Sequence, residues 1–141
     1  MGKRFRTNSG AVDAVRECSL KLYSSQSISI VGPSGSGKST LLNIMGTLAK
    51  PSYGTTLYMG RSIIDFSGKD LSSLRNQFIG FVFQHHCLFP SLTTLQNVSL
   101  PLLYSGLSRS ERKQRAFNSL ESVGLADLSD RRPKQLSSGQ S

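Results

Sequence analysis

The sequence predicts an α/β fold, and three observations support this prediction. Between residues 28 and 49, a short β-branched segment is followed by a glycine-rich loop and then by apolar residues at helical spacing. Strand-like patterns dominate the first part of the chain, and helical patterns dominate from about residue 90 onwards. The composition, 37% hydrophobic and 18% charged, is typical of a globular chain and excludes a disordered or collagen-like one.

The first elements are expected to be strands. Residues 17–22 alternate between polar and apolar side chains, which predicts a strand with one face in solvent. A turn is expected over 24–26, and the β-branched run at 28–31 predicts a buried strand. After the glycine-rich loop, residues 39–49 have the apolar spacing of a helix, which Pro51 would end.

The middle of the chain is expected to hold a hairpin, two helices and a further strand. Residues 55–59 and 63–64 flank a Gly-Arg pair and predict the hairpin. A short helix is expected over 71–75 and a hydrophobic strand over 78–83. Beyond Gln84, two prolines punctuate a helix expected over 92–103.

The strongest helix signal begins at Ser108, which forms an S-x-x-E capping box with Glu111. Glu111 and Arg115 have the spacing of a helical ion pair, and Gly124 is placed to end the helix. Four apolar residues share the face that this helix should bury: Ala116, Phe117, Leu120 and Val123.

The charge balance points to anionic partners. The chain has 17 basic and 8 acidic residues, a net charge of +9, which favours phosphates, nucleic acid or an acidic membrane surface. The basic residues lie in small separated groups without interleaved aromatic residues, so no nucleic-acid groove is expected. No apolar run approaches the roughly 18 residues of a membrane span. Cys18 and Cys87 are far apart, which suggests a reducing compartment.

Residues 32–39, Gly-Pro-Ser-Gly-Ser-Gly-Lys-Ser, match the motif G-x-x-x-x-G-K-[ST], the P-loop. The glycines allow successive backbone N–H groups to face phosphate oxygens, and a helix that starts there adds the positive end of its dipole. Lys38 would supply a positive charge to the β- and γ-phosphates, and the Ser39 hydroxyl could bind Mg²⁺. The sequence therefore predicts a P-loop NTPase that binds a nucleoside triphosphate.

Two further motifs carry a family resemblance. Residues 136–140, Leu-Ser-Ser-Gly-Gln, resemble the Leu-Ser-Gly-Gly-Gln signature of ATP-binding cassette (ABC) transporters, with Ser138 in place of the first glycine. Residues 81–84, Phe-Val-Phe-Gln, resemble the Q-loop of that family. The amino-acid sequences of residues 30–46, 75–84 and 97–106 resemble those of the lipoprotein-release and macrolide-export branch. The resemblance to the family covers nearly all 141 residues.

The resemblance implies a partial ABC nucleotide-binding domain over residues 1–141, incomplete at its C-terminus. It would have a parallel core sheet, an antiparallel β subdomain and a helical subdomain. Residues 1–89 would form the P-loop core with the antiparallel β part and the Q-loop, and residues 90–141 the helical subdomain ending in the signature. Family members couple ATP binding and hydrolysis to export or lipoprotein release by a membrane permease. This implies a cytoplasmic protein, peripheral on the inner face of the cell membrane.

The resemblance also implies a role for each motif residue. Phe5 falls where an aromatic residue stacks on adenine, and the triphosphate would be held by Gly32, Pro33, Ser34, Gly35, Ser36, Gly37, Lys38, Ser39 and Thr40. Lys38 and Gln84 would be catalytic, with Ser39 and Gln84 as Mg²⁺ ligands. Family members pair head to tail, so the ATP of a second subunit would be contacted by Ser137, Ser138, Gly139 and Gln140.

The sequence departs from the family beyond the signature. There the family has an apolar run ending in Asp-Glu and then a histidine; these 141 residues contain no such run, and their two histidines, His85 and His86, precede the signature. We therefore expect an ABC-type ATPase by resemblance whose 141 residues bind Mg-ATP without efficient turnover. The strand at 28–31 would lack a parallel neighbour and form an aggregation-prone edge. Two alternatives remain open: a short non-hydrolysing nucleotide-binding module, and part of a soluble ABC protein acting on nucleic acid or ribosomes.

Overall fold

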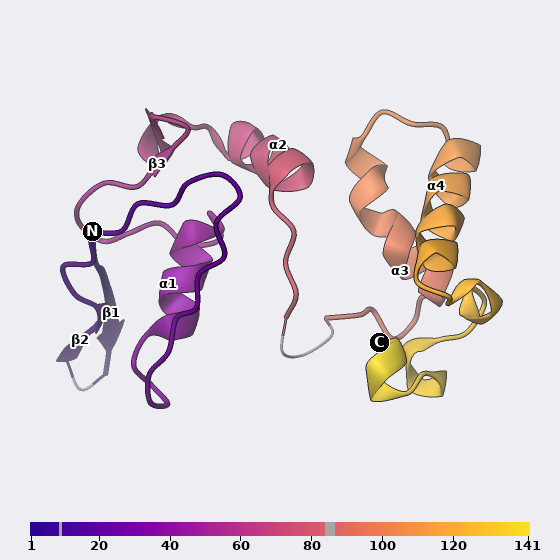
Figure 1. The fold of residues 1–141 in the computed structure, drawn as a ribbon, viewed down its shortest axis with the longest axis horizontal. Coiled ribbons are helices and arrows are strands. Elements are labelled where there is room, and N and C mark those ends of the chain that lie inside the picture. The colour runs from indigo at the N-terminus through magenta and orange to yellow at the C-terminus, as the bar shows by residue number, and fades with distance from the viewer. Residues whose placement is uncertain (9, 84–86) are drawn as a thin grey trace. The chain divides into compact units, whose positions relative to one another are not determined.

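The computed structural model describes residues 1–8, 10–83 and 87–141. It divides into two compact units (Figure 1): unit 1 is Met1–Phe81 and unit 2 is Val82–Ser141. In the described ranges, no helix is both long enough and apolar enough to cross a membrane. The P-loop lies in unit 1, and the signature lies in unit 2.

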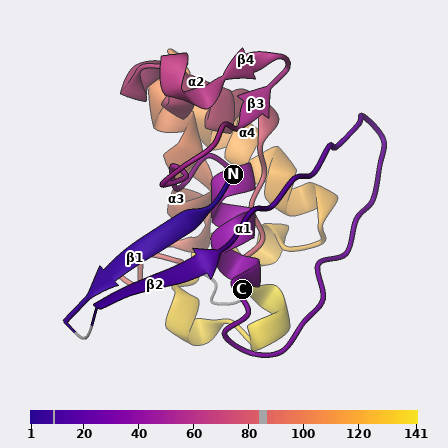
Figure 2. The same ribbon diagram turned by 90° about the vertical axis from the view of Figure 1, so that its left-hand side faces the viewer.

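Unit 1 begins with an antiparallel hairpin (Figure 2) of β1 (Lys3–Thr7) and β2 (Gly10–Val15), in which Phe5 lies opposite Val12. Our strand prediction for 17–22 is wrong, because the structure has no strand there. Residues 17–22 do alternate between polar and apolar side chains, but no strand lies beside them. By contrast, β1 and β2 pair with each other across a short connection. The hairpin was missed because neither strand alternates strictly between polar and apolar residues.

Helix α1 (Lys38–Met45) follows the P-loop as predicted but ends four residues before position 49. The Gly46 N–H donates to the Leu42 carbonyl at 2.8 Å, and Thr47 then adopts a left-handed φ of 59°. This reversal ends the helix before Pro51 is reached. Ile44, on its inner face, is fully buried and anchors the small core of unit 1.

The predicted second hairpin is confirmed, with β3 (Leu57–Tyr58) paired antiparallel to β4 (Arg61–Ser62). Residues 63–64, predicted as strand, lie instead in a 3₁₀ turn (Ile63–Asp65). Helix α2 (Gly68–Phe78) is longer than the predicted 71–75, because Ser67 and Asp70 form a capping box that starts it earlier. Among the described residues of unit 1, the buried apolar side chains are Val15, Ile44, Ile63, Leu71 and Leu74, and Thr47 is a buried polar one.

The strands predicted over 28–31 and 78–83 are not formed. Residues 16–33 contain the predicted turn near residue 25 but no helix or strand, and Val31 is 86% exposed. Phe78 ends α2, and residues 79–83 are irregular. A strand needs the hydrogen-bonding groups of a neighbour. In the described part of the chain, the sheets are two antiparallel pairs, and neither borders residues 28–31.

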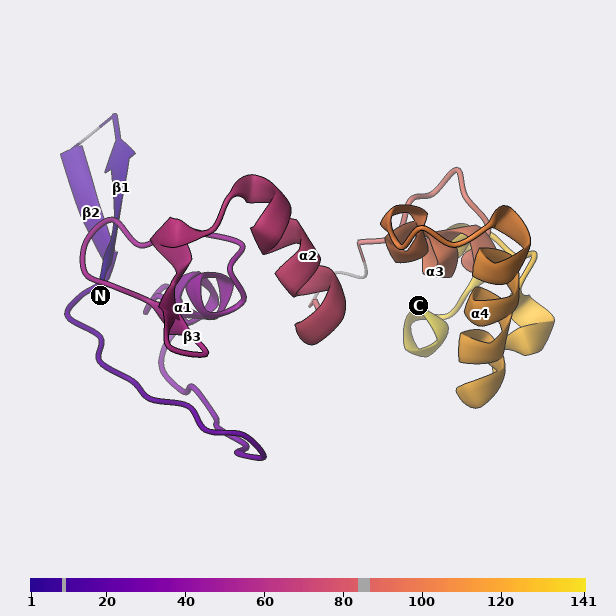
Figure 3. The same ribbon diagram turned by 90° about the horizontal axis from the view of Figure 1, so that it is seen from above.

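Unit 2 is helical. Its main elements are α3 (Thr94–Ser99), a 3₁₀ segment (Leu100–Tyr104) and α4 (Arg109–Ser122), and α3 packs against α4 (Figures 1 and 3). The helix predicted over 92–103 is thus partly right, since its second half tightens into the 3₁₀ segment around Pro101. Three short 3₁₀ turns complete the unit, at Ala126–Leu128, Pro133–Gln135 and Ser138–Gln140.

Helix α4 begins and ends where the sequence predicts. Ser108 and Glu111 form the expected capping box, and Gly124 follows the C-cap with a left-handed φ of 72°. Ala116 and Leu120 are buried as predicted, whereas Val123 is 65% exposed because it lies past the last helical turn. The spacing of Glu111 and Arg115 does not produce an ion pair; the Glu111 carboxylate accepts the Ser108 N–H at 2.9 Å instead.

Candidate functional site

The P-loop is folded around its own lysine. The Lys38 ammonium donates to the carbonyls of Gly32 at 3.0 Å and Pro33 at 2.7 Å. The Ser36 N–H donates to the Pro33 carbonyl at 3.3 Å and closes the turn. These bonds hold a positive charge at the mouth of the loop, directly before α1.

The N-terminus of α1 offers backbone donors at the same place. Its N-cap, Gly37, forms no side-chain capping bond, and the first N–H that pairs along the helix is that of Leu41, which donates to the Gly37 carbonyl at 2.9 Å. Helix geometry therefore leaves the N–H groups of residues 38–40 without an acceptor in the helix. N–H groups and a dipole in this arrangement attract an anion.

Gly37 is required by both conformation and space. Its φ is 89°, and a Cβ atom placed on it would lie 1.9 Å from the Ala14 carbonyl oxygen of β2. The loop thus rests directly on the end of the first hairpin. An open pocket of about 340 Å³ lies where they meet. Its lining residues are Ala14, Val15, Arg16, Cys18, Ile30, Val31, Gly32, Pro33, Ser36, Gly37, Lys38 and Leu41.

The donors around this pocket fit a polyphosphate. Backbone N–H groups and the Lys38 ammonium are present, and none of the described residues that line the pocket carries a carboxylate. The Ser39 side chain follows immediately and is exposed, so its hydroxyl can serve as an oxygen ligand to a hard cation such as Mg²⁺. Five of the predicted phosphate-binding residues line the pocket; Ser34, Gly35, Ser39 and Thr40 do not.

An ion pair lies in the hairpin beside this pocket. Arg4 donates to both carboxylate oxygens of Asp13, at 2.6 and 2.9 Å, and Arg16 lies 3.8 Å from the same carboxylate. The hydrogen bond from Arg4 lowers the pKa of Asp13 and raises the pKa of Arg4. Asp13 is therefore ionised and already paired, and its negative charge opposes an incoming phosphate less than a free carboxylate would.

Phe5 and Gln84 are the remaining residues that the sequence predicts at the nucleotide site. The Phe5 ring lies on β1, is 45% exposed and has the Lys3 ammonium 5.4 Å from its centroid. It does not line the pocket beside the P-loop, so its proposed contact with adenine stays a prediction. Gln84 lies outside the described residues, and its role also stays a prediction.

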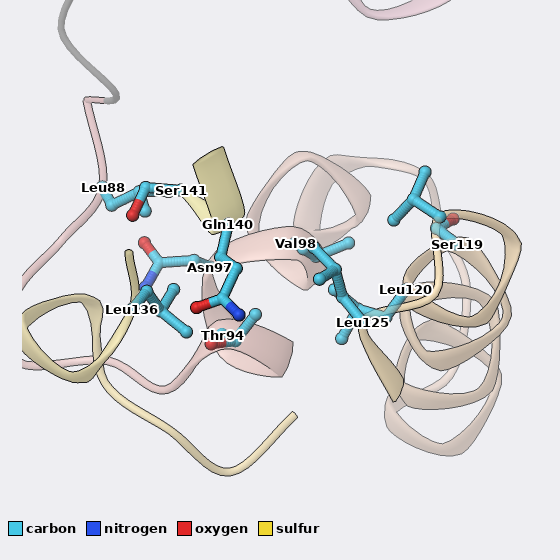
Figure 4. A pocket seen from close by; sticks show the side chains of 11 residues that line it. Leu88, Thr94, Asn97, Val98, Ser119, Leu120, Leu125, Leu136, Gln140 and Ser141 are labelled. Carbon is cyan, nitrogen blue, oxygen red and sulfur yellow. The ribbon is translucent and has the colours of Figure 1, made fainter. Parts of the chain in front are cut away.

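The signature lies in unit 2 as a capped turn. Ser137 precedes the 3₁₀ turn Ser138–Gln140, and its N–H donates to the Gln140 side-chain carbonyl at 2.9 Å. Ser137, Ser138 and Gly139 are exposed and therefore accessible to a second molecule. Leu136, Gln140 and Ser141 border a cavity of about 250 Å³ that also involves side chains from α3 and α4 (Figure 4).

Sequence reasoning missed two buried polar residues beside that cavity, Thr94 and Asn97. The capping box of α3, formed by Thr93 and Gln96, was a readable signal for the helix start. No sequence pattern marked Asn97 as buried, because its side chain bonds to backbone groups of residues 89–93, and backbone partners leave no trace in the sequence.

Comparison with known proteins gives a family match. The family model described as ABC transporter matches residues 15–141. An uncharacterized ABC transporter ATP-binding protein of Thermotoga maritima is 47% identical over 129 residues, 92% of this chain and 55% of that protein. The lipoprotein-releasing system ATP-binding protein LolD of Bacteroides thetaiotaomicron is 42% identical, over 93% of this chain and 60% of that protein.

A macrolide export ATP-binding/permease protein, MacB 2 of Yersinia pestis, is 44% identical over 99% of this chain and 21% of its own length. Among solved structures, a dimeric structure of MJ0796, a bacterial ABC transporter cassette, matches with a TM-score of 0.87 and 38% identity. That match covers 99% of this chain and 62% of the MJ0796 chain. The same cassette is also known in a post-hydrolysis state bound to ADP and Pi. The chain therefore spans 55–61% of the length of the first curated relatives that it matches.

Proposed function

The chain belongs to the ABC transporter family, and on that premise we propose that it is the ATP-binding part of a transporter that exports a substrate or releases lipoproteins through a membrane permease. The predicted fold class, a P-loop NTPase of ABC type, is confirmed by the likeness to the MJ0796 cassette. The choice of branch is supported by two relatives, whose names give macrolide export and lipoprotein release as their tasks.

The observation that carries the proposal is the position of Lys38. Its ammonium is held by two loop carbonyls, in front of the free N–H groups at the start of α1. A triphosphate entering the loop would replace those neutral carbonyls with charged oxygens, which form stronger bonds to an ammonium. Residues 32–40 would hold the triphosphate, and Ser39 with Gln84 would hold Mg²⁺, which neutralises charge on the phosphates when bound.

The second half of the proposal concerns pairing. We assign the ATP of a second subunit to Ser137, Ser138, Gly139 and Gln140, in a head-to-tail dimer. Ser137, Ser138 and Gly139 are exposed in unit 2, and the similar MJ0796 cassette is dimeric. In this arrangement, the permease places the protein at the inner face of the membrane. Phe5 stacks on adenine, and Gln84 couples the nucleotide site to the permease.

Binding is tested with the purified chain by titration with a fluorescent ATP analogue in the presence of Mg²⁺. Lys38→Ala removes a charge-assisted contact, which we expect to weaken binding by about 2 kcal/mol, or roughly 30-fold. Lys69→Ala, which removes an exposed lysine from α2 in the same unit, is the matched control and should bind like the parent chain. Equal affinity for the parent and Lys38→Ala would exclude the P-loop as the site.

Turnover is tested in the same samples by phosphate release. These 141 residues contain no apolar run ending in Asp-Glu, so we propose that ATP binds and is hydrolysed negligibly. Phosphate release by the parent chain that disappears in Lys38→Ala would overturn this part of the proposal and leave the binding part intact.

A further inference from the structure

The Asn97 side chain, in the middle of α3, is buried in unit 2 and fully used in hydrogen bonds. Its Oδ1 accepts the Phe89 N–H at 2.8 Å. Its Nδ2 donates to the carbonyls of Phe89 at 3.2 Å, Leu92 at 3.3 Å and Thr93 at 3.0 Å. One amide thus holds most of the loop that leads into α3. This loop begins just after Gln84, and we call residues 87–93 the post-Q segment.

The N-terminus of the same helix holds a different part of the chain. The Thr94 N–H and hydroxyl both donate to the Arg131 carbonyl, at 2.7 and 2.9 Å. The Leu95 N–H donates to the Ser129 carbonyl at 2.9 Å. The first N–H groups of a helix have no partner within it, so here they bind the segment that leads to the signature.

The signature segment, residues 136–141, follows closely. A 3₁₀ turn connects it to Arg131, and the Leu136 N–H donates to the Pro133 carbonyl at 3.1 Å. Leu136, Gln140 and Ser141 border the same cavity as Thr94 and Asn97 (Figure 4). Helix α3 therefore contacts the chain leading from Gln84 on one side and the chain leading to the signature on the other.

We propose that Asn97 and Thr94 are positioning residues that make the post-Q segment and the signature segment move together. This inference rests on the proposed function, in which Gln84 faces the ATP of its own subunit and the signature faces the ATP of the partner. A change at one nucleotide is then transmitted through two buried side chains of a single short helix to the residues that contact the other.

The first test measures amide hydrogen exchange by NMR in the purified chain without nucleotide. In Asn97→Ala, exchange of the Phe89 amide should accelerate by roughly tenfold, and exchange in the signature segment should accelerate with it. The Leu120 amide in α4 reports whether unit 2 is still folded and should not change. Gln114→Ala, which removes the exposed Gln114–Asn118 bond on α4, is the control and should leave both segments unchanged. Acceleration at Phe89 without any change in the signature segment would overturn the proposal.

A second pair of variants keeps the test decisive if Asn97→Ala unfolds unit 2. Thr94→Val keeps the shape of the side chain and removes the hydroxyl that binds the Arg131 carbonyl. The signature segment should exchange faster in this variant, and Thr94→Ser, which restores the hydroxyl, should return it to the parent rate. If the side chain only fills space, Thr94→Val should exchange like the parent and Thr94→Ser, which lacks the methyl group, should exchange faster; that outcome would exclude positioning by the hydroxyl.

The third arm adds Mg-ATP. In the parent chain and in Thr94→Ser, ATP should slow exchange in the P-loop and change exchange in the signature segment. In Thr94→Val and Asn97→Ala, the P-loop should still be protected, but the signature segment should no longer respond. An unaltered response in these variants would overturn the proposal. If ATP protects no P-loop amide in the parent, the proposed function fails, and the nucleotide-free measurements still decide whether α3 links the two segments.

Discussion

Units 1 and 2 differ in how far the local sequence determines their secondary structure. In unit 2, α4 starts at a capping box and ends before a left-handed glycine, both within its own sequence. In unit 1, residues 16–33 form no helix or strand despite two strand-like patterns. A helix satisfies its backbone within one segment, whereas a strand needs another segment beside it. Periodicity is therefore a safer guide to the helical unit than to the unit that holds the P-loop.

The difference also affects function. The P-loop joins an irregular, exposed segment to the short helix α1, so its geometry depends on a few contacts, chiefly those of Lys38 and Gly37. The signature turn is linked through Thr94 to a packed helix pair. We expect the phosphate loop to open more easily than the signature segment in the absence of nucleotide, because loops with few buried contacts have low local stability.

The largest expected effects come from the two cores. Leu120→Ala in unit 2 and Ile44→Ala in unit 1 each remove a buried side chain and should lower the free energy of unfolding of their own unit by about 3 kcal/mol. Urea denaturation followed by NMR, which reports each unit separately, measures both. Val123→Ala, on an exposed side chain of unit 2, is the control, with an expected change below about 0.5 kcal/mol. If either core variant shifts both transitions equally, the two units unfold as one.

Next in size is the effect of a Cβ atom in the P-loop. Gly37→Ala places that atom against the Ala14 carbonyl and should destabilise the local structure by about 2 kcal/mol or more, with loss of ATP binding. Gly35→Ala has a similar left-handed φ of 76° but open space around it, so only the conformational cost of about 1 kcal/mol should appear. Thermal unfolding and ATP titration of these two variants separate the steric cost of the added Cβ atom from the cost of its backbone conformation. Equal losses would mean that the contact with β2 is unimportant.

The helix caps should contribute less. Ser67→Ala in unit 1 and Ser108→Ala in unit 2 each remove the side chain that accepts an N–H in a capping box, at a cost of about 1 kcal/mol. Far-UV circular dichroism during urea unfolding gives the change. Ser110→Ala, an exposed substitution inside α4, should have almost no effect. A cap in unit 1 that costs nothing would show that α2 is held by its packing alone.

The smallest expected effect is a loss of helix stability at acidic pH. Hydrogen bonds from Ser108 lower the pKa of Glu111 below its ordinary 4.5, and bonds from Ser67 lower the pKa of Asp70 below its ordinary 3.8. A carboxyl whose pKa is lowered by folding adds stability above its ordinary value and loses it as the pH falls through the lower folded value. Both helices should therefore weaken below about pH 4.5 in α4 and pH 3.8 in α2.

Glu111→Gln is the matched variant for this measurement, because its amide oxygen can still accept the Ser108 N–H but does not titrate. A pH titration of α4 helicity should flatten in the variant. An unchanged profile would assign the acid sensitivity to another group.

The local patterns of the chain were sufficient for the P-loop, the hairpin at residues 57–62 and the limits of α4. Each depends on residues within a few positions of one another: a glycine spacing, a turn and a capping box. The β1–β2 hairpin and the early end of α1 are also local, but the strands lack strict alternation and Thr47 is not a usual stop signal. The irregular path of residues 16–33 depends instead on which segments lie beside it.

The same distinction separates Lys38 from Asn97. Lys38 is recognisable because the chemistry of phosphate binding requires a lysine at a fixed distance from glycines in one short segment. Asn97 is an ordinary helical residue until folding brings the Phe89 backbone to its amide and the Arg131 carbonyl to the neighbouring Thr94. A buried amide is stable only with partners for its polar atoms. For Asn97 those partners are backbone groups four to eight residues earlier, and they reach the amide only once the loop before α3 has folded.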